Sequence, residues 1–204
     1  MKHVIPALAL ILLAPVAALA QDETEAEIVP LADLSAYINT LETAQATFTQ
    51  INSDGSVSTG DLYLHRPGRM RFDYDGDDLL VIAGGQRVAI FDGRSNTRPE
   101  QYPLSETPLS LVLAPEVDFS RSGLVADHSF DGTATRVLAQ DPDRPETGTL
   151  ELVFTGDPVE LRQWVVTDSG GVETTVVLGG LETGMELRPA LFSINTEINM
   201  RSDE

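Results

Sequence analysis

The chain has 204 residues, with 32 acidic side chains against 13 Lys and Arg, a formal net charge of −19 and no cysteine. This length fits one domain with a sizeable core, and the missing cysteines exclude disulfides, thiol nucleophiles, Cys-ligated zinc and lipid attachment through a cysteine. The acidic balance argues against a nucleic-acid partner, because contacts to phosphates need clustered positive charge.

The first twenty residues have the pattern of a secretory signal peptide. A short basic start precedes an apolar run over residues 4–19, and the tripeptide that ends at Ala20 has the small–any–small cleavage pattern. The run contains two prolines and is shorter than the roughly 20 residues of a membrane span. We therefore expect cleavage after Ala20, export to the periplasm and a single domain over 21–204. That domain contains no lysine, which excludes a P-loop and Schiff-base chemistry.

The next segment predicts a helix and then strands. Leu31, Leu34, Ile38 and Leu41 recur at steps of three and four, which predicts a helix over 31–45 with one apolar face. After this helix the apolar residues alternate with polar ones, which is typical of strands. Asp-Gly and Gly-Gly turns join the alternating runs into antiparallel hairpins. The expected strands cover 47–51, 57–65, 69–74, 79–82 and 87–91.

An apolar segment then interrupts the strands. Thr107 and Pro108 mark the start of a short helix over 107–114, and Pro115 ends it. Strands are expected again near 124–130, 135–140, 149–155, 161–167 and 172–178, with a last pair near 186–187 and 192–194. The predicted fold is mainly β with few helices, in the α+β class. An antiparallel sheet of ten or more strands must curl, so the helices would cover a concave face, and such a cavity suits an apolar ligand.

Three motifs resemble the LolA family of periplasmic outer-membrane lipoprotein carriers. They are Phe48-Thr49-Gln50, the hairpin from Gly60 to Tyr74 with Arg66-Pro67-Gly68-Arg69 at its turn, and Thr107-Pro108-Leu109. The resemblance covers most of 31–200 and is weakest after about residue 125. It implies a LolA/LolB-like fold, in which a curved antiparallel half-barrel, or unclosed β-barrel, is covered by a helical lid.

The resemblance also implies a function. Such a periplasmic chaperone binds the acyl chains of triacylated lipoproteins that an inner-membrane lipoprotein-releasing ABC transporter supplies. It carries them as a monomer to an outer-membrane lipoprotein acceptor, with no cofactor, no metal and no catalysis. In this family the arginine of the Arg-Pro hairpin locks the lid of the empty carrier, and Arg66 occupies that position. An apolar residue important in handover, often Phe, lies four residues further on, where this chain has Met70.

Apolar residues on the predicted concave face and lid are the expected contacts to acyl chains. They are Phe48, Leu62, Leu64, Met70, Phe72, Tyr74, Leu109 and Leu113. Ordinary roles are open for neighbouring residues: Arg69 and Arg71 could pair with acidic residues on a solvated face, and Trp164 could belong to the core. His65 and His128 lack the spacing of a metal motif.

Two other functions stay open. The same half-barrel could hold a free lipid or another apolar small molecule in the periplasm. A hydrolase that uses Asp and Glu side chains is a third class, for which the sequence nominates no pair of carboxylates.

Overall fold

The computed structural model describes residues 27–76, 79–95 and 97–202, so the expected signal peptide lies outside the described residues. The described strands are β1 Thr43–Ile51, β2 Val57–His65, β3 Arg69–Tyr74, β4 Leu79–Gly84, β5 Arg87–Asp92, β6 Glu100–Pro103, β7 Val125–Phe130, β8 Thr135–Gln140, β9 Thr149–Thr155, β10 Glu160–Thr167, β11 Glu173–Leu178 and β12 Glu182–Thr183. The helices are α1 Leu31–Thr40 and α2 Ile194–Ser202, with 3-10 turns η1 Leu104–Glu106, η2 Pro108–Leu111, η3 Pro145–Thr147 and η4 Pro189–Phe192.

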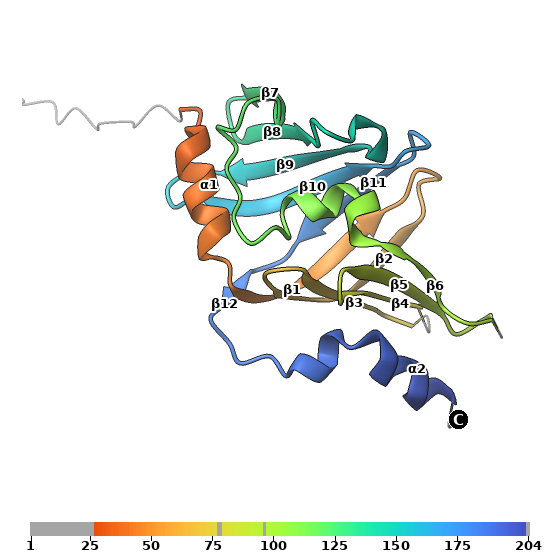
Figure 1. Cartoon of the computed structure of the whole chain (residues 1–204). Helices are drawn as coiled ribbons and strands as arrows, with labels where there is room; N and C mark the ends of the chain where they lie inside the picture. The colour runs from red at the N-terminus through yellow and green to blue at the C-terminus, as the bar shows by residue number, and fades with distance from the viewer. Residues whose placement is uncertain (1–26, 77–78, 96, 203–204) are drawn as a thin grey trace, which may run out of the picture.

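The strands form one curved antiparallel sheet that is not closed into a barrel. The strand order is β6-β5-β4-β3-β2-β1-β11-β10-β9-β8-β7, and the short β12 pairs with one end of β1. The end strands β6 and β7 do not pair with each other in the described residues. In Figure 1 the two halves of the sheet form a lower and an upper layer, with the segment before β7 between them. The predicted mainly β half-barrel is confirmed.

Alternation along the strands builds the core on the concave face. Leu62 lies opposite Phe72 and Leu64 opposite Met70 across the β2–β3 hairpin, and all four side chains are buried. Because residues directly opposite each other share a face, this register places one apolar row inside. The facing half of the sheet contributes buried Leu150, Leu152, Phe154, Leu161, Trp164, Val176 and Leu178.

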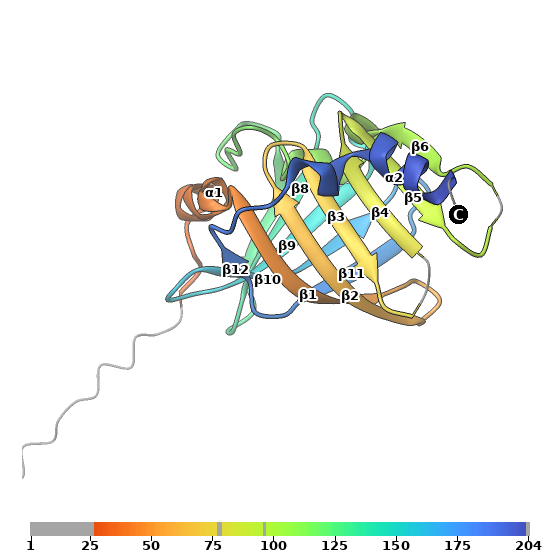
Figure 2. The same cartoon turned by 90° about the horizontal axis from the view of Figure 1, so that it is seen from below.

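The C-terminal segment, from η4 to the end of α2, packs on the opposite, convex face. η4 lies against β3 and β4 and α2 against β4, and Figure 2 shows α2 beside β4 and β5. Arg71 donates to the Leu191 carbonyl at 3.1 Å and to Glu197 at 3.3 Å, and Ile194 packs with Phe91 in a small second core. Arg71 also pairs with Asp73 at 2.8 Å. The prediction that Arg71 pairs with acidic residues is therefore confirmed, although Arg71 and Glu197 are largely buried.

Several predicted boundaries were wrong. The helix expected over 31–45 ends at Thr40, because residues from Thr43 onward pair with β2 instead. The helix expected over 107–114 is a single 3-10 turn, because η2 ends at Leu111 after four residues that include Pro108. The two strands expected near 186–187 and 192–194 are absent: residues 186–187 have no regular structure, and η4 and α2 cover the second position, where Pro189 cannot donate to a ladder. Strand β6 was not expected.

An aromatic cluster fills the end of the concave face near the β1–β2 turn. The ring of Phe48 makes edge contacts with Phe72 at 5.3 Å and with Tyr74 at 5.1 Å, and Phe72 contacts Trp164 at 6.3 Å. The Tyr74 hydroxyl donates to Gln50 Oε1 at 2.7 Å. Burial raises the pKa of Tyr74 to about 12, because the protein excludes the water that would solvate the phenolate.

None of the helices in the described ranges combines the length and the apolar character that a membrane-crossing helix requires.

The first prediction concerns the attachment of the C-terminal segment. A Cβ added at Gly84 would lie 2.1 Å from the Phe192 carbonyl oxygen, so Gly84→Ala should push this segment off β4. We expect the free energy of unfolding in urea to fall by about 1–3 kcal/mol, as for other overpacked sites. Gly180→Ala is the control, because its Cβ meets nothing within 4 Å and should change stability by less than about 0.5 kcal/mol. Equal effects of the two substitutions would contradict the close packing at Gly84.

The second prediction concerns pH. Folding raises the pKa of Tyr74 to about 12, so between pH 10 and 12 the folded state binds more protons than the unfolded state. The free energy of unfolding should therefore fall as pH rises through this window. The loss attributable to Tyr74 should be on the order of 2 kcal/mol. Tyr74→Phe should lack this pH-dependent loss. Urea unfolding of both proteins at pH 9, 10, 11 and 12 measures the difference in their free energies of unfolding. An identical pH dependence in both proteins would show that Tyr74 titrates as an exposed tyrosine does.

Candidate functional site: an apolar cavity beneath an arginine-bound lid

Two elements cover the concave face: helix α1 and the segment 104–119, which we call the lid segment. The lid segment contains η1 and η2, and η2 lies against β8, β9 and β10. Its buried side chains include Leu104, Leu113, Val117 and Phe119. The lid segment therefore contributes to the core although its backbone is mostly irregular.

Helix α1 presents Leu34 and Ile38 to the core, as its spacing predicted, and a polar row to the lid segment. The amide of Asn39 donates to the Val117 carbonyl at 2.8 Å and accepts from the Val117 N–H at 3.0 Å. The Ser35 hydroxyl accepts from the Phe119 N–H at 2.9 Å. These bonds join α1 to the C-terminal end of the lid segment.

The β2–β3 turn holds Arg66 between these two elements. Gly68 adopts the left-handed conformation with φ of 72°, which a glycine tolerates without strain. The Arg66 N–H donates to the Glu42 carbonyl at 2.8 Å, and the Gly68 N–H donates to the Leu113 carbonyl at 2.9 Å. The turn is thus bound to the chain after α1 on one side and to the lid segment on the other.

The guanidinium of Arg66 links the sheet to both covering elements. Nη1 donates to the Ile38 carbonyl near the end of α1. Nη2 donates to the Ala114 carbonyl at 2.8 Å and to Asn39 Oδ1 at 3.2 Å. A planar group with several fixed donors can serve three acceptors at once, which a lysine cannot do with the same geometry.

Burial raises the free-energy cost of breaking the hydrogen bonds of Arg66. Arg66 is only 9% exposed, and this burial lowers the pKa of its guanidinium. No basic residue lies in the last turn of α1, so Arg66 supplies from outside the cation that a helix C-terminus favours. Because only water could replace these carbonyl acceptors, the bonds of Arg66 favour the closed arrangement, although its Nε has no partner there.

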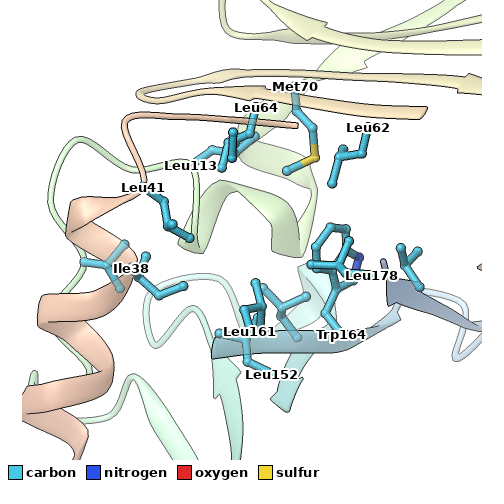
Figure 3. Packing of buried hydrophobic residues seen from close by; sticks show 14 of the residues in the cluster. Ile38, Leu41, Leu62, Leu64, Met70, Leu113, Leu152, Leu161, Trp164 and Leu178 are labelled. Carbon is cyan, nitrogen blue, oxygen red and sulfur yellow. The ribbon is translucent and has the colours of Figure 1, made fainter. Parts of the chain in front are cut away.

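A small apolar cavity of about 30 Å³ remains beneath α1 and the lid segment. Figure 3 shows Met70 and Leu64 on one side pointing toward Leu161 and Leu152 on the other. The cavity is about the size of one water molecule, so the described conformation has no room for an acyl chain. Any larger apolar ligand must displace the lid.

Most of the residues predicted from the sequence line this cavity. Leu62, Leu64, Arg66, Met70, Leu109 and Leu113 are all part of its lining. Phe48, Phe72 and Tyr74 are not in the lining, although they belong to the same core cluster. These three form the aromatic cluster, which already fills the adjoining part of the concave face.

Sequence analysis missed the contribution of the far half of the sheet. The further lining residues are Ile38, Leu41, Val112, Leu152, Leu161, Trp164, Leu178 and Leu181. Ile38 and Leu41 belong to the predicted apolar stripe, and Trp164 was interpreted as core. The alternation of β9–β11 indicated which residues point inward, but it could not show that these strands curl back to face β2 and β3.

The other polar candidates lie outside the cavity. Arg69 donates to the His65 carbonyl at 3.2 Å, and it has no carboxylate partner among the described residues. The His65 ring packs against Phe192 at 5.8 Å on the convex side, and His128 lies near the Val29 carbonyl at 3.0 Å. No group of three or more His, Asp or Glu side chains within 27–76, 79–95 and 97–202 is arranged to hold a metal ion.

Comparison with known proteins agrees with the sequence resemblance. The chain is 29% identical over 178 residues to an outer-membrane lipoprotein carrier protein of Xylella fastidiosa, covering 82% of this chain and 81% of that protein. It is 25% identical over 181 residues to the protein of the same name from Methylococcus capsulatus, covering 84% and 86%.

Among solved structures, a LolA superfamily protein from Nitrosomonas europaea matches with a TM-score of 0.44 and 8% identity, over 81% of this chain and 98% of that one. The family described as outer membrane lipoprotein carrier protein LolA matches residues 39–195. This match begins near the end of α1 and spans the lid segment, the Arg66 turn and every described strand of the sheet, so the chain belongs to the LolA family.

Proposed function

We propose that this protein is a periplasmic carrier that encloses the acyl chains of lipoproteins between its concave sheet face and its lid. It would receive triacylated lipoproteins from an inner-membrane lipoprotein-releasing ABC transporter and deliver them to an outer-membrane lipoprotein acceptor. The observation that carries this proposal is a closed apolar cavity whose two covering elements meet at one buried arginine, in a chain of the LolA family. The proposed role needs neither a cofactor nor catalysis, and it assigns residues 1–20 to export.

The energetics explain why a carrier needs a lid that closes well. Each buried methylene of an acyl chain contributes about 0.8 kcal/mol, so an open apolar cleft would bind three chains almost irreversibly. Here cargo must first break the bonds of Arg66 and separate Leu113 from Leu64 and Met70. The free energy recovered when these contacts form again offsets part of the cargo's binding energy. In this way the closed lid promotes release.

The third prediction tests the cargo itself. Purified protein incubated with a triacylated lipoprotein should form a soluble one-to-one complex, measured by native mass spectrometry. The acyl chains should quench or shift the emission of Trp164, which is the only tryptophan of the chain and lines the cavity. If only free lipids co-purify from the periplasm and the lipoprotein does not bind, the protein is a lipid-binding protein on the same fold. If a diacylated lipoprotein bound with the same affinity, the proposed preference for triacylated cargo would be wrong.

The fourth prediction tests the lock. Arg66→Leu keeps an apolar stem but removes the donors to Ile38 and Ala114. Losing a net charge-assisted bond of about 1.5–3 kcal/mol lowers the ratio of closed to open protein about ten- to hundredfold. Cargo should therefore stay on the variant, and transfer to outer-membrane acceptors should fall by a similar factor.

Arg69→Leu is the matched control. Arg69 lies on the same hairpin, and its side chain donates to the His65 carbonyl rather than to α1 or the lid segment. It should transfer cargo as the unchanged protein does. Circular dichroism and thermal unfolding of both variants check that each one folds. Normal transfer by folded Arg66→Leu would show that Arg66 does not act as a lock.

A further inference from the structure

The lid segment follows directly from β6, where the Leu104 N–H donates to the Gln86 carbonyl at 2.9 Å, and it is bound to the opposite half of the sheet as well. Its C-terminal end contacts Arg66, which follows β2. At its N-terminal end, the Ser105 carbonyl accepts a 2.7 Å hydrogen bond from Arg144 Nη1. Arg144 lies in the turn between β8 and β9, and in the strand order β8 is separated from β2 by β1, β11, β10 and β9. The Arg144 contact therefore reaches across the open side of the half-barrel.

The turn between β8 and β9 holds Arg144 in this position. Asp141 accepts from Arg144 Nη2 at 2.9 Å and from the Asp143 N–H at 2.9 Å. The Gln140 amide donates to the Pro145 carbonyl at 3.0 Å, just beyond Arg144. Because its donor group is oriented by a neighbouring carboxylate, Arg144 can bind Ser105 with little further loss of side-chain entropy.

The two arginine contacts differ in strength. Arg66 is 9% exposed and serves three acceptors, whereas the Arg144 side chain is 42% exposed and reaches the lid segment through one. Solvent weakens an exposed charged contact far more than a buried one. The residues around them differ as well. Leu113 and Val117 are buried near Arg66, whereas Ser105 and Glu106, which follow the buried Leu104, are both exposed.

We infer that Arg144 is a second latch of the lid, and that the contact between the lid segment and the β8–β9 turn opens before the contacts of Arg66 do. The inference rests on the proposed function to the extent that the opening admits acyl chains. It assigns the two latches different tasks. Arg144 controls how readily cargo enters between β6 and the β8–β9 turn, and Arg66 controls the complete release of the lid.

Hydrogen exchange of the empty protein tests the order of opening without any cargo. The N–H groups of Thr107 and Ser110 report on the Ser105 end, and those of Val117 and Phe119 report on the Arg66 end. In Arg144→Leu the first pair should exchange about two- to fivefold faster, as expected for loss of one exposed charged contact, and the second pair should be unchanged. Asp141→Asn should act in the same direction with a smaller effect.

Arg136→Leu is the control. Arg136 is 36% exposed and pairs with Asp131 and Glu151 on the sheet surface, away from the lid. Exchange in this variant should match the unchanged protein at all four positions. The inference is overturned if Arg144→Leu leaves Thr107 and Ser110 unchanged, or if it accelerates all four positions equally, because the lid would then open as one unit.

Uptake of a triacylated lipopeptide, followed by Trp164 fluorescence, then connects the latch to the function. Arg144→Leu should take up the lipopeptide about two- to fivefold faster than the unchanged protein and release it normally, whereas Arg66→Leu should release it slowly. Equal uptake rates for Arg144→Leu and the unchanged protein would overturn the role of Arg144 in entry. Failure of the unchanged protein to bind the lipopeptide would instead refute the proposed function, and the exchange result would still decide whether Arg144 is a latch.

Discussion

The contact of Arg66 with the carbonyls of Ile38 and Ala114 is the interaction on which the closed structure depends. It connects three segments that are distant in sequence: the β2–β3 turn, α1 and the lid segment. A buried guanidinium is costly unless acceptors surround it, so the same residue that stabilises the closed lid makes partial loosening of the Arg66 end unfavourable. This favours two distinct states of that end, one closed and one in which it has moved away and water solvates Arg66.

A carrier of this kind must balance two apolar interactions against each other. The concave face is a protein core when the lid is closed and a candidate ligand surface when it is open, with Leu64 and Met70 serving in both. Close packing of Leu113 against these residues leaves a cavity of only about 30 Å³. Among the described acidic side chains only Glu197 is buried, so their negative charge lies on the outside, where it opposes association with anionic surfaces.

The local parts of this design could be predicted from the sequence, and the long-range parts could not. Alternation identified β2 and β3 and the inward direction of Leu62 and Met70, while Arg66 stood out through a family motif. The lining by Leu152 and Trp164 depends on how far the sheet curls, which no local pattern encodes. Helix α2 was missed because its apolar residues, Ile194 and Ile198, contact only a small patch on the convex face, so its apolar stripe is too weak to identify. The 3-10 turns of the lid segment bury Leu104 and Pro108, and η2 packs against β8, β9 and β10, so tertiary packing rather than helix propensity holds them.

Contacts on both faces of the sheet fix the register of strand β3. Met70 and Phe72 point into the core under the lid, while Arg71 between them points to the C-terminal segment and binds Leu191 and Glu197. A slip of β3 by one residue would bury a guanidinium in the apolar core and turn two large apolar side chains toward a carboxylate. Misaligned pairing during folding is thus penalised on both sides of the sheet at once. The C-terminal segment contributes no residue to the cavity lining. It nevertheless helps to fix the register of β3, the strand that presents Met70 to the cavity.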